Sequence, residues 1–325
     1  MPMPSTAAMD REAFDALVAR LSRQSVDKHF EAYADVAWDE LTADEPLDAA
    51  GLGLWTFDPL GRTAWYQAQS AERQAEIGLH RIAAAMKIGW QFENLLQQGL
   101  LQYCMRLPNG APEFRYLHHE IIEESQHSLM FQELVNRTGY DVHGMPLALK
   151  LLAKHFVVPI NHWFPELFFL FVLGGEEPVD HLQRRQLREG RSHPLVEQIM
   201  RIHITEEARH ISFARSFLKQ RVPSLSGARR RCLAVSVPVL LGVMAPMMVN
   251  PTPDLHRAQG VPKEVLREAA RSREADRLRR DSVAKVRRLC GELGLLTPTA
   301  RLLWRLVGLW DDPADPRRPQ DDGVD

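Results

Sequence analysis

The segment "RIHITEEARH", residues 201–210, places two histidines and two glutamates in ten positions of a helical pattern. His203, Glu207 and His210 are spaced i, i+4 and i+7, so they fall on one stripe of a helix with 3.6 residues per turn. The same stripe continues into Ala214 and Phe217, which are apolar. Three side chains that could bind a metal are therefore expected on a buried helix face.

A second stretch, "EESQH", has the same kind of spacing. It gives Glu124 and His127 at i, i+3, which is the Glu-x-x-His pattern of Glu207 and His210, and the chain has these two matches. Both glutamates lie on apolar stripes, where an unpaired charge is unfavourable by several kcal/mol. A bound cation would compensate for that charge.

Two more apolar helices carry isolated carboxylates. In "AMKIGWQFENLLQQGLLQYC", Glu93 is the one charged residue on its apolar face. In "PELFFLFVLGGEE", we expect an apolar helix to end at Glu176 and Glu177, either of which could be the ligand. Each helix thus offers a carboxylate that needs a positive partner.

One Glu from each of two helices, plus one Glu-x-x-His from each of two others, is the ligand set of di-iron and di-manganese four-helix bundles. Oxygen and imidazole ligands suit iron and manganese, and no thiolate cluster suggests zinc or an iron–sulfur site. We therefore predict an all-α, ferritin-like four-helix bundle with additional helices and two bound Fe ions, with Mn as the alternative. Two ferrous ions could together donate two electrons to O₂.

A four-helix bundle with six metal ligands does not require His203, which would be a seventh ligand. His203 lies about 10.5 Å from His210 along the helix axis, so the spacing permits a seventh ligand if both rings lean inward. Among the neighbouring acids, Glu120 is our candidate for orienting a ligand histidine. Glu123 is expected to point a quarter turn away from the site, and Glu206 is interpreted as structural or solvated.

The order Glu, Glu-x-x-His, Glu, His-x-x-x-Glu-x-x-His resembles the p-aminobenzoate N-oxygenase (AurF-like) family of di-iron oxygenases, over about residues 70–220. The resemblance implies seven metal ligands, Glu93, Glu124, His127, Glu176, His203, Glu207 and His210. Glu176 is preferred to Glu177 because its distance from His203 matches the family spacing. No catalytic residue beyond the ligands and no other cofactor-binding residue is predicted.

The resemblance implies a monooxygenase that uses O₂ to oxidise an aromatic or other small amine towards hydroxylamine, nitroso and nitro products. Another di-iron hydroxylase or desaturase, or a ferroxidase or iron store, would use similar ligands. The sequence contains no nucleotide-binding Gly-x-Gly-x-x-Gly after a strand and no Cys cluster. We therefore expect an external electron donor, a ferredoxin or a reductase.

Helical periodicity dominates the elements that must position these residues. Long helices are predicted over 71–106, 112–138, 147–175, 193–220, 228–249 and 263–293. The predicted interruptions are "LPNG" (107–110), "TGYDVHG" (138–144) and "GGEEP" (174–178). We expect a mobile segment at 1–30, one helical domain at 31–310 with its ligands within 71–220, and a disordered acidic tail at 311–325.

The bulk composition is that of a globular protein, with 325 residues, 45% hydrophobic and 25% charged. A net charge of −2 gives no reason to expect a nucleic-acid partner. Three scattered cysteines and the lack of a signal-peptide pattern favour the cytoplasm. The apolar run 232–249 contains two prolines, and we interpret it as a kinked core helix rather than a membrane span. A homodimer is also expected.

Overall fold

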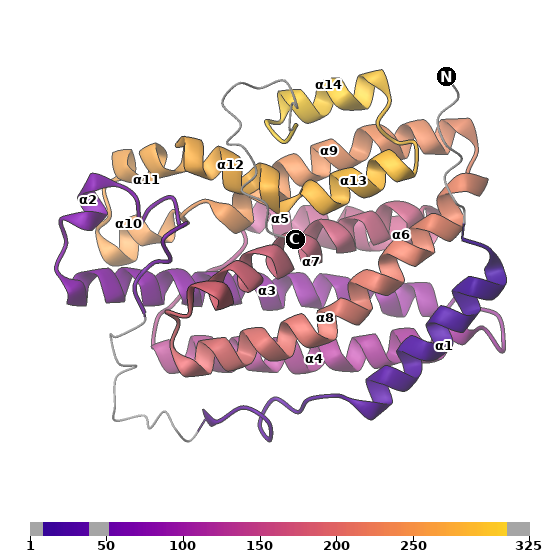
Figure 1. Ribbon diagram of the computed structural model, residues 1–325, viewed down its shortest axis with the longest axis horizontal. Helices are drawn as coiled ribbons and strands as arrows, with labels where there is room; N and C mark the ends of the chain where they lie inside the picture. The colour runs from indigo at the N-terminus through magenta and orange to yellow at the C-terminus, as the bar shows by residue number, and fades with distance from the viewer. Residues whose placement is uncertain (1–8, 39–51, 311–325) are drawn as a thin grey trace.

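The computed structural model describes residues 9–38 and 52–310, and this part of the chain is helical with no β-strand. Four long helices form the central bundle shown in Figure 1. They are α3 (Ala71–Cys104), α4 (Pro112–Thr138), α7 (Pro165–Glu189) and α8 (Pro194–Arg221). The predicted fold class, a ferritin-like helical bundle with additional helices, is confirmed.

The bundle consists of two helix pairs that pack on each other. α3 lies along α4 and α7 lies along α8, while contacts of α4 with α8 and of α3 with α7 close the bundle. Local sequence determines where these helices begin and end. The Ser70 side chain accepts from the backbone N–H of Arg73 at the start of α3. Gly139 and Gly190 end α4 and α7 with φ of 69° and 58°, a conformation that favours glycine.

The predicted break at 174–178 is wrong, because α7 continues through Pro178 to Glu189. The two glycines of this stretch serve close packing instead. A Cβ on Gly175 would lie 2.0 Å from Cζ of Phe92 on α3. The missing side chain therefore lets α7 approach α3, and it places Glu176 in the middle of the helix rather than at its end.

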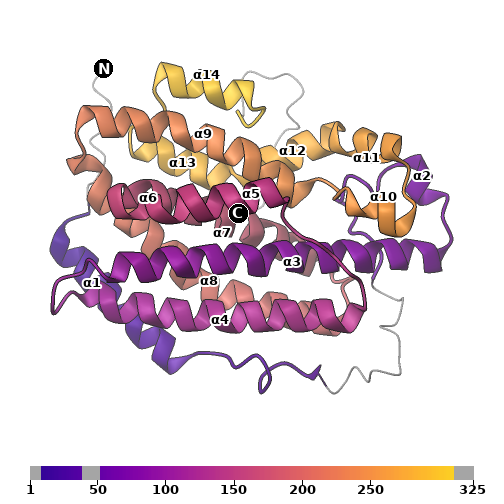
Figure 2. The same ribbon diagram turned by 180° about the vertical axis from the view of Figure 1, so that it is seen from behind.

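The helix predicted over 147–175 is divided. Its first part forms α5 (Leu147–Leu152), a π-helical turn η2 (Ala153–Val157) and α6 (Val158–Trp163), and α7 follows. The division falls at Phe164, whose φ of −145° and ψ of 68° are not helical. Pro165 explains this break, because a residue that precedes proline is disfavoured in the helical conformation. Figure 2 shows α5 and α6 beside α3.

The segment predicted to be mobile, residues 1–30, contains the helix α1 (Arg11–Asp27). Phe14, Val18 and Leu21 of α1 are buried, and the helix packs against α4 and α8. The prediction of mobility is therefore wrong for this helix, whose apolar stripe covers the bundle. Residues 1–8 and the predicted acidic tail at 311–325 lie outside the described residues.

An outer layer covers α7 on the side away from α4 (Figure 1). It contains α9 (Gly227–Val249) and α14 (Pro298–Leu306), which pack on each other. The helix predicted over 263–293 divides into α11 (Lys263–Ala270), α12 (Arg273–Ser282) and α13 (Ala284–Glu292). Short elements complete the described chain: α2 (Ala64–Gln67), η3 (Val222–Ser224) and α10 (Asp254–Gln259).

Within the described residues, the stretch Gly227–Gln259 is long and apolar enough to cross a membrane by length and composition. Its helix α9 buries Leu233, Val237 and Leu241 against the rest of the protein. Val239 and Val243 on the other side are 52% and 45% exposed. One face of α9 thus belongs to the core, as predicted for 232–249.

Candidate metal centre

Seven histidine and glutamate side chains meet inside the four-helix bundle. Each is at most 2% exposed. They are Glu93 from α3, Glu124 and His127 from α4, Glu176 from α7, and His203, Glu207 and His210 from α8. Six of them form four overlapping groups of three whose nitrogen and oxygen atoms lie within 4.8 Å of one another. The structure thus brings together the seven residues singled out in the sequence.

His203 is fully buried and faces this cluster. Its Nε2 lies 3.5 Å from Oε1 of Glu93 and 3.6 Å from Oε1 of Glu207. His210 completes the group from the other end, with Nδ1 2.9 Å from Oε1 of Glu124 and 3.2 Å from Oε1 of Glu207. His203 and His210 are about 10.5 Å apart along the helix axis, and they approach the shared carboxylate of Glu207 from its two sides.

Several atoms that face the centre make no hydrogen bond within the described chain. They are Oε2 of Glu93, Oε1 of Glu124, Oε1 of Glu176, Nε2 of His203, both oxygens of Glu207 and Nδ1 of His210. The distance between His210 and Glu124 is short, but the pair lacks hydrogen-bond geometry. Buried polar atoms without partners are unfavourable. A pair of metal ions would satisfy them, so these residues fit a dinuclear metal site with oxygen and imidazole ligands.

Two of the histidines are held from outside the cluster by carboxylates of the opposite helix. Nε2 of His127 on α4 lies 2.9 Å from Oε2 of Glu206 on α8. Nε2 of His210 on α8 lies 2.7 Å from Oε2 of Glu123 on α4. If each Nε2–H donates to its carboxylate, Nδ1 of both rings carries no proton and can bind metal. Nδ1 of His127 faces the cluster, 3.1 Å from Oε2 of Glu124. The glutamate that precedes each Glu-x-x-His motif therefore orients the histidine of the other motif.

The third histidine has a different outer partner. We assign Nδ1–H of His203 as the donor to Oε1 of Gln183 on α7, at 2.9 Å. This bond leaves Nε2 directed at the cluster. Arg209 lies between the two outer carboxylates, with Nη2 2.8 Å from Glu123 and 3.4 Å from Glu206. Its charge balances carboxylates that would otherwise be buried without a cation.

The outer partners Glu123, Glu206 and Gln183 were not predicted from the sequence, and the orienting role predicted for Glu120 is wrong. Glu206, interpreted as structural or solvated, is buried and contacts His127. Glu123, rather than the predicted Glu120, contacts a ligand histidine. A signal was present, because both motifs have a doubled glutamate, in "EESQH" and "EEARH". The first glutamate of each pair points about 100° away from the second, towards the neighbouring helix. Glu120 is buried, and burial raises its pKa to about 8.

The choice between the two glutamates of α7 follows from their neighbours. Glu176 lies in the cluster, grouped with Glu93, Glu124, His203 and Glu207. Glu177 turns to the other side of α7, where Nε of Arg215 donates to its Oε1. The geometry thus favours Glu176.

Without metal, the cluster distributes charge unevenly. Burial and the carboxylates of Glu124 and Glu207 raise the pKa of Glu93 well above its ordinary value. Burial and the nearby Glu207 and Glu93 likewise raise the pKa of Glu176. Burial opposes the charged form of His210, but Glu207 and Glu124 outweigh it and raise its pKa strongly. In the metal-free protein, protons on Glu93, Glu176 and His210 thus balance the negative charge that bound cations would otherwise balance.

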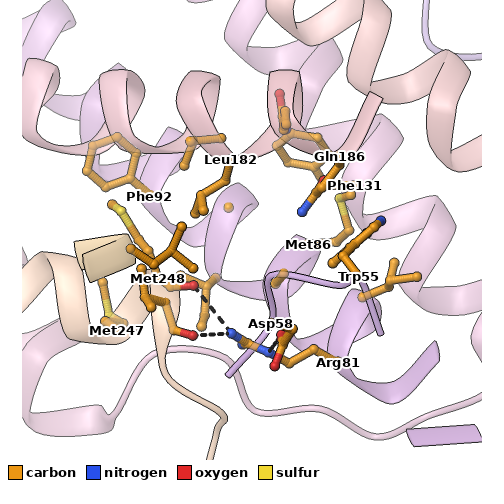
Figure 3. Close-up of a pocket in the computed structure, with 18 of the residues that line it drawn as sticks. Trp55, Asp58, Arg81, Met86, Phe92, Phe131, Leu182, Gln186, Met247 and Met248 are labelled. Carbon is orange, nitrogen blue, oxygen red and sulfur yellow. Dashed lines mark hydrogen bonds and ion pairs between the residues drawn. The ribbon is translucent and has the colours of Figure 1, made fainter. Parts of the chain in front are cut away.

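A cavity of about 120 Å³ adjoins the cluster. Glu93 and Glu176 form part of its wall, so a molecule in the cavity would lie beside the metal site. Apolar side chains make up most of the rest, including Trp55, Phe92 and Phe131. Figure 3 shows these three side chains around the cavity, with Leu182 from α7 and Met248 from the end of α9.

Two similar proteins match almost the whole length of this chain. An uncharacterized protein of Mycobacterium tuberculosis (strain ATCC 25618 / H37Rv) is 41% identical over 312 residues, which cover 94% of this chain and 90% of the relative. An uncharacterized protein of Mycobacterium bovis (strain ATCC BAA-935 / AF2122/97) has the same identity and coverage. No solved structure matches the chain.

The family described as p-aminobenzoate N-oxygenase AurF matches residues 11–294. This match reaches beyond the region of resemblance at about residues 70–220, and it includes α1 and most of the outer layer. The fold, the buried cluster of glutamates and histidines and the match over most of the chain agree, and the protein belongs to the p-aminobenzoate N-oxygenase AurF family of di-iron enzymes.

Proposed function

We propose that the protein is a non-haem di-iron oxygenase that uses O₂ to oxidise the nitrogen of a small aromatic amine. The observation that carries this proposal is the convergence of seven buried glutamate and histidine side chains, six of which have centre-facing atoms without a hydrogen bond within the described residues. Glu93, Glu124, His127, Glu176, His203, Glu207 and His210 would hold two iron ions, or two manganese ions as the alternative.

The metal pair, when bound, would supply the electrons that activate O₂. The first oxidation converts R–NH₂, O₂, two electrons and two protons into R–NHOH and water. One oxygen atom enters the product and the other leaves as water. Further oxidations of the same nitrogen give the nitroso and nitro compounds that the family resemblance implies. The electrons come from outside the chain, for which we propose a ferredoxin or a reductase.

The chain's own residues would position the amine and exclude water. Glu93 and Glu176 belong both to the cluster and to the cavity wall, so the cavity directs its occupant to that side of the metal site. Phe131 lines the cavity, and its ring centroid is 5.1 Å from that of His203. An apolar wall of this kind keeps reactive species away from bulk water.

Two alternatives use the same ligands. A related di-iron hydroxylase or desaturase would also need an organic substrate beside the metals, so only its products would differ. A ferroxidase or iron store would need no cavity for an organic molecule. The cavity beside Glu93 and Glu176 therefore favours an oxygenase.

The cytoplasmic location and the homodimer also remain proposals. Large apolar side chains on α5, η2 and α6 support self-association, since Leu151, Phe156 and Trp163 are 48%, 65% and 75% exposed. Exposed aromatic and aliphatic groups are common at interfaces between protein chains. Sedimentation at several protein concentrations would measure the oligomeric state.

The test of function begins with metal content. Protein produced in iron-replete cells should contain about two iron ions per chain, as the ligand set implies. Glu207→Ala should lose most of this metal, because Glu207 approaches His127, His203 and His210. Glu197→Ala on the same helix, where Glu197 pairs with Arg201 at the surface, should keep it. One zinc and no iron in the wild type would contradict the proposal.

The reaction is tested next. Reduced protein is exposed to ¹⁸O₂ with a panel of arylamines, and the products are identified by mass spectrometry. We expect hydroxylamine, nitroso or nitro products that carry ¹⁸O on nitrogen, and none with Glu207→Ala. Products hydroxylated only at carbon, or dehydrogenated, would support the other oxygenase reactions. Oxidation of added iron with no organic product would support iron storage.

A further inference from the structure

The size of the cavity restricts the substrate that the proposed N-oxygenase would accept. Its volume is about 120 Å³. A buried apolar cavity of roughly 150 Å³ holds one benzene molecule. The cavity therefore has the size of a single six-membered ring with small substituents, and a molecule with two fused or linked rings would extend out of it or require the wall to move.

The charge of the cavity restricts the substrate further. Besides Glu93 and Glu176, the charged side chains in the described wall are those of Asp58 and Arg81. These two are 4% and 5% exposed and form an ion pair, with Nε of Arg81 3.3 Å from Oδ2 of Asp58. Figure 3 shows the pair on one side of the cavity, opposite Leu182 and Gln186.

The guanidinium of Arg81 is also held by the backbone. Its Nη2 donates to the carbonyl oxygen of Val249 at 2.7 Å, at the end of α9. Asp58 is fixed in turn, because its Oδ1 accepts from the backbone N–H of Leu60 at 2.8 Å. Among the described residues of the wall, the one cation is thus already paired, and its partner is held in place by the backbone.

An anionic substituent would consequently meet no unpaired positive charge at this side of the cavity. Burial of an ionised carboxylate without a new partner is strongly unfavourable. A neutral ring would instead contact Phe92, Phe131 and Trp55, and the amide of Gln186 could hydrogen-bond an uncharged polar substituent.

Given the proposed function, we infer that the substrate is a neutral, single-ring arylamine, and that Asp58 excludes carboxylated rings by neutralising Arg81. Asp58 is thus a specificity-determining residue. The family takes its name from p-aminobenzoate, which is an anion near neutral pH. This chain would discriminate against that molecule.

Binding without turnover tests the inference. Metal-loaded protein is titrated under anaerobic conditions with p-aminobenzoate and with p-aminobenzamide, which has the same shape and no charge. We expect the wild type to bind the amide at least tenfold more tightly, measured by calorimetry. A two-ring arylamine such as 2-naphthylamine should bind more weakly than the amide.

Asp58→Asn is the variant that separates charge from shape. Its side-chain oxygen retains the acceptor for the N–H of Leu60, while the charge opposite Arg81 is removed. We expect the preference for the amide over the carboxylate to fall at least tenfold. Asp141→Asn is the control, because Asp141 is exposed and does not line the cavity, and it should leave the preference unchanged.

The outcomes are distinct from those of the functional test. Wild-type protein that binds p-aminobenzoate as tightly as the amide would overturn the inference, and so would failure to bind either ring. An unchanged preference in folded Asp58→Asn would overturn the role of Asp58. If the amide binds selectively but no N-oxygenated product forms in the reaction with O₂, the proposed function fails and the charge selectivity of the cavity remains.

Discussion

The three histidines of the cluster do not face it with the same ring nitrogen. His127 and His210 direct Nδ1 inward and are held at Nε2 by Glu206 and Glu123, whereas His203 directs Nε2 inward and is held at Nδ1 by Gln183. Each outer bond determines the tautomer and the ring plane. The residues that contact the histidines from outside therefore prepare the site before metal binds.

We expect Glu206→Gln to weaken metal binding without unfolding the protein. The change removes the charge that fixes Nε2–H of His127 but keeps the size of the side chain. Loss of such an outer partner typically lowers metal affinity by about 10- to 100-fold. Competition with a chelator would measure the affinity. Glu197→Gln, on the surface of the same helix, is the control, and equal affinities for the two variants would contradict the orienting role of Glu206.

Metal binding should release protons and weaken as the pH falls. Burial opposes charge on His127, but hydrogen bonds with Glu124 and Glu206 raise its pKa well above the usual value, and the pKa of His210 is raised as well. Both rings are therefore in the cationic form, with a proton on each nitrogen, near neutral pH in the metal-free protein. Each ring must lose one of these protons to bind metal. Titration with Mn²⁺ in weak buffer should release protons, and the affinity at about pH 6 should be lower than at about pH 8. An affinity independent of pH would contradict this.

At the scale of elements, the approach of α7 to α3 determines whether Glu176 and Glu93 can share a site. The ring of Phe92 occupies the space beside Gly175. Phe92 directly precedes Glu93 in the sequence, and Gly175 directly precedes Glu176. The helix pair therefore depends on a residue without a side chain, in a position where sequence alone indicated a break.

Gly175→Ala should destabilise the protein and reduce its metal content. The new Cβ would lie 2.0 Å from Cζ of Phe92, so the ring or the helix must shift. Overpacking of a core in this way typically costs about 1–3 kcal/mol. Gly227→Ala is the control, because its Cβ would meet nothing nearer than 3.8 Å, at Nη1 of Arg231. Thermal unfolding and metal analysis give the two readouts, and identical melting temperatures would refute the packing argument.

At the scale of the whole molecule, the chain encloses its bundle on several sides. α1 covers α4 and α8, and the outer layer of α9, α12 and α13 covers α7. This enclosure buries two of the three cysteines, Cys104 on α3 and Cys290 on α13, and leaves Cys232 on α9 exposed. The thiols thus report on packing in distant parts of the molecule.

One thiol of three should react with an alkylating reagent in the native protein at about pH 8. Burial raises the pKa of Cys104 to about 11 and that of Cys290 to about 12, so both remain protonated and shielded there. Cys232 should react alone, and all three should react after denaturation. Mass spectrometry of the labelled peptides identifies the sites. Native labelling of Cys290 would mean that α13 does not pack as described.

The sequence by itself determined the helical class and the stripe on which each ligand lies. Glu124 and His127, and likewise His203, Glu207 and His210, share a face through the 3.6-residue period, which is a local property. A carboxylate on an apolar stripe also needs a partner whatever the packing is. Each of these properties belongs to a single helix, so it does not depend on the neighbouring helices.

Only the tertiary structure decided what lies between helices. Glu206 and Glu123 hold histidines of the opposite helix, and their role depends on how α4 and α8 face each other. The stretch 174–178 remains helical because Phe92 fills the space beside Gly175, although glycine and proline locally favour a break. The pairing of Arg81 with Asp58 joins α3 to a distant loop in the same way. Contacts between distant segments arise from packing, which local periodicity does not specify.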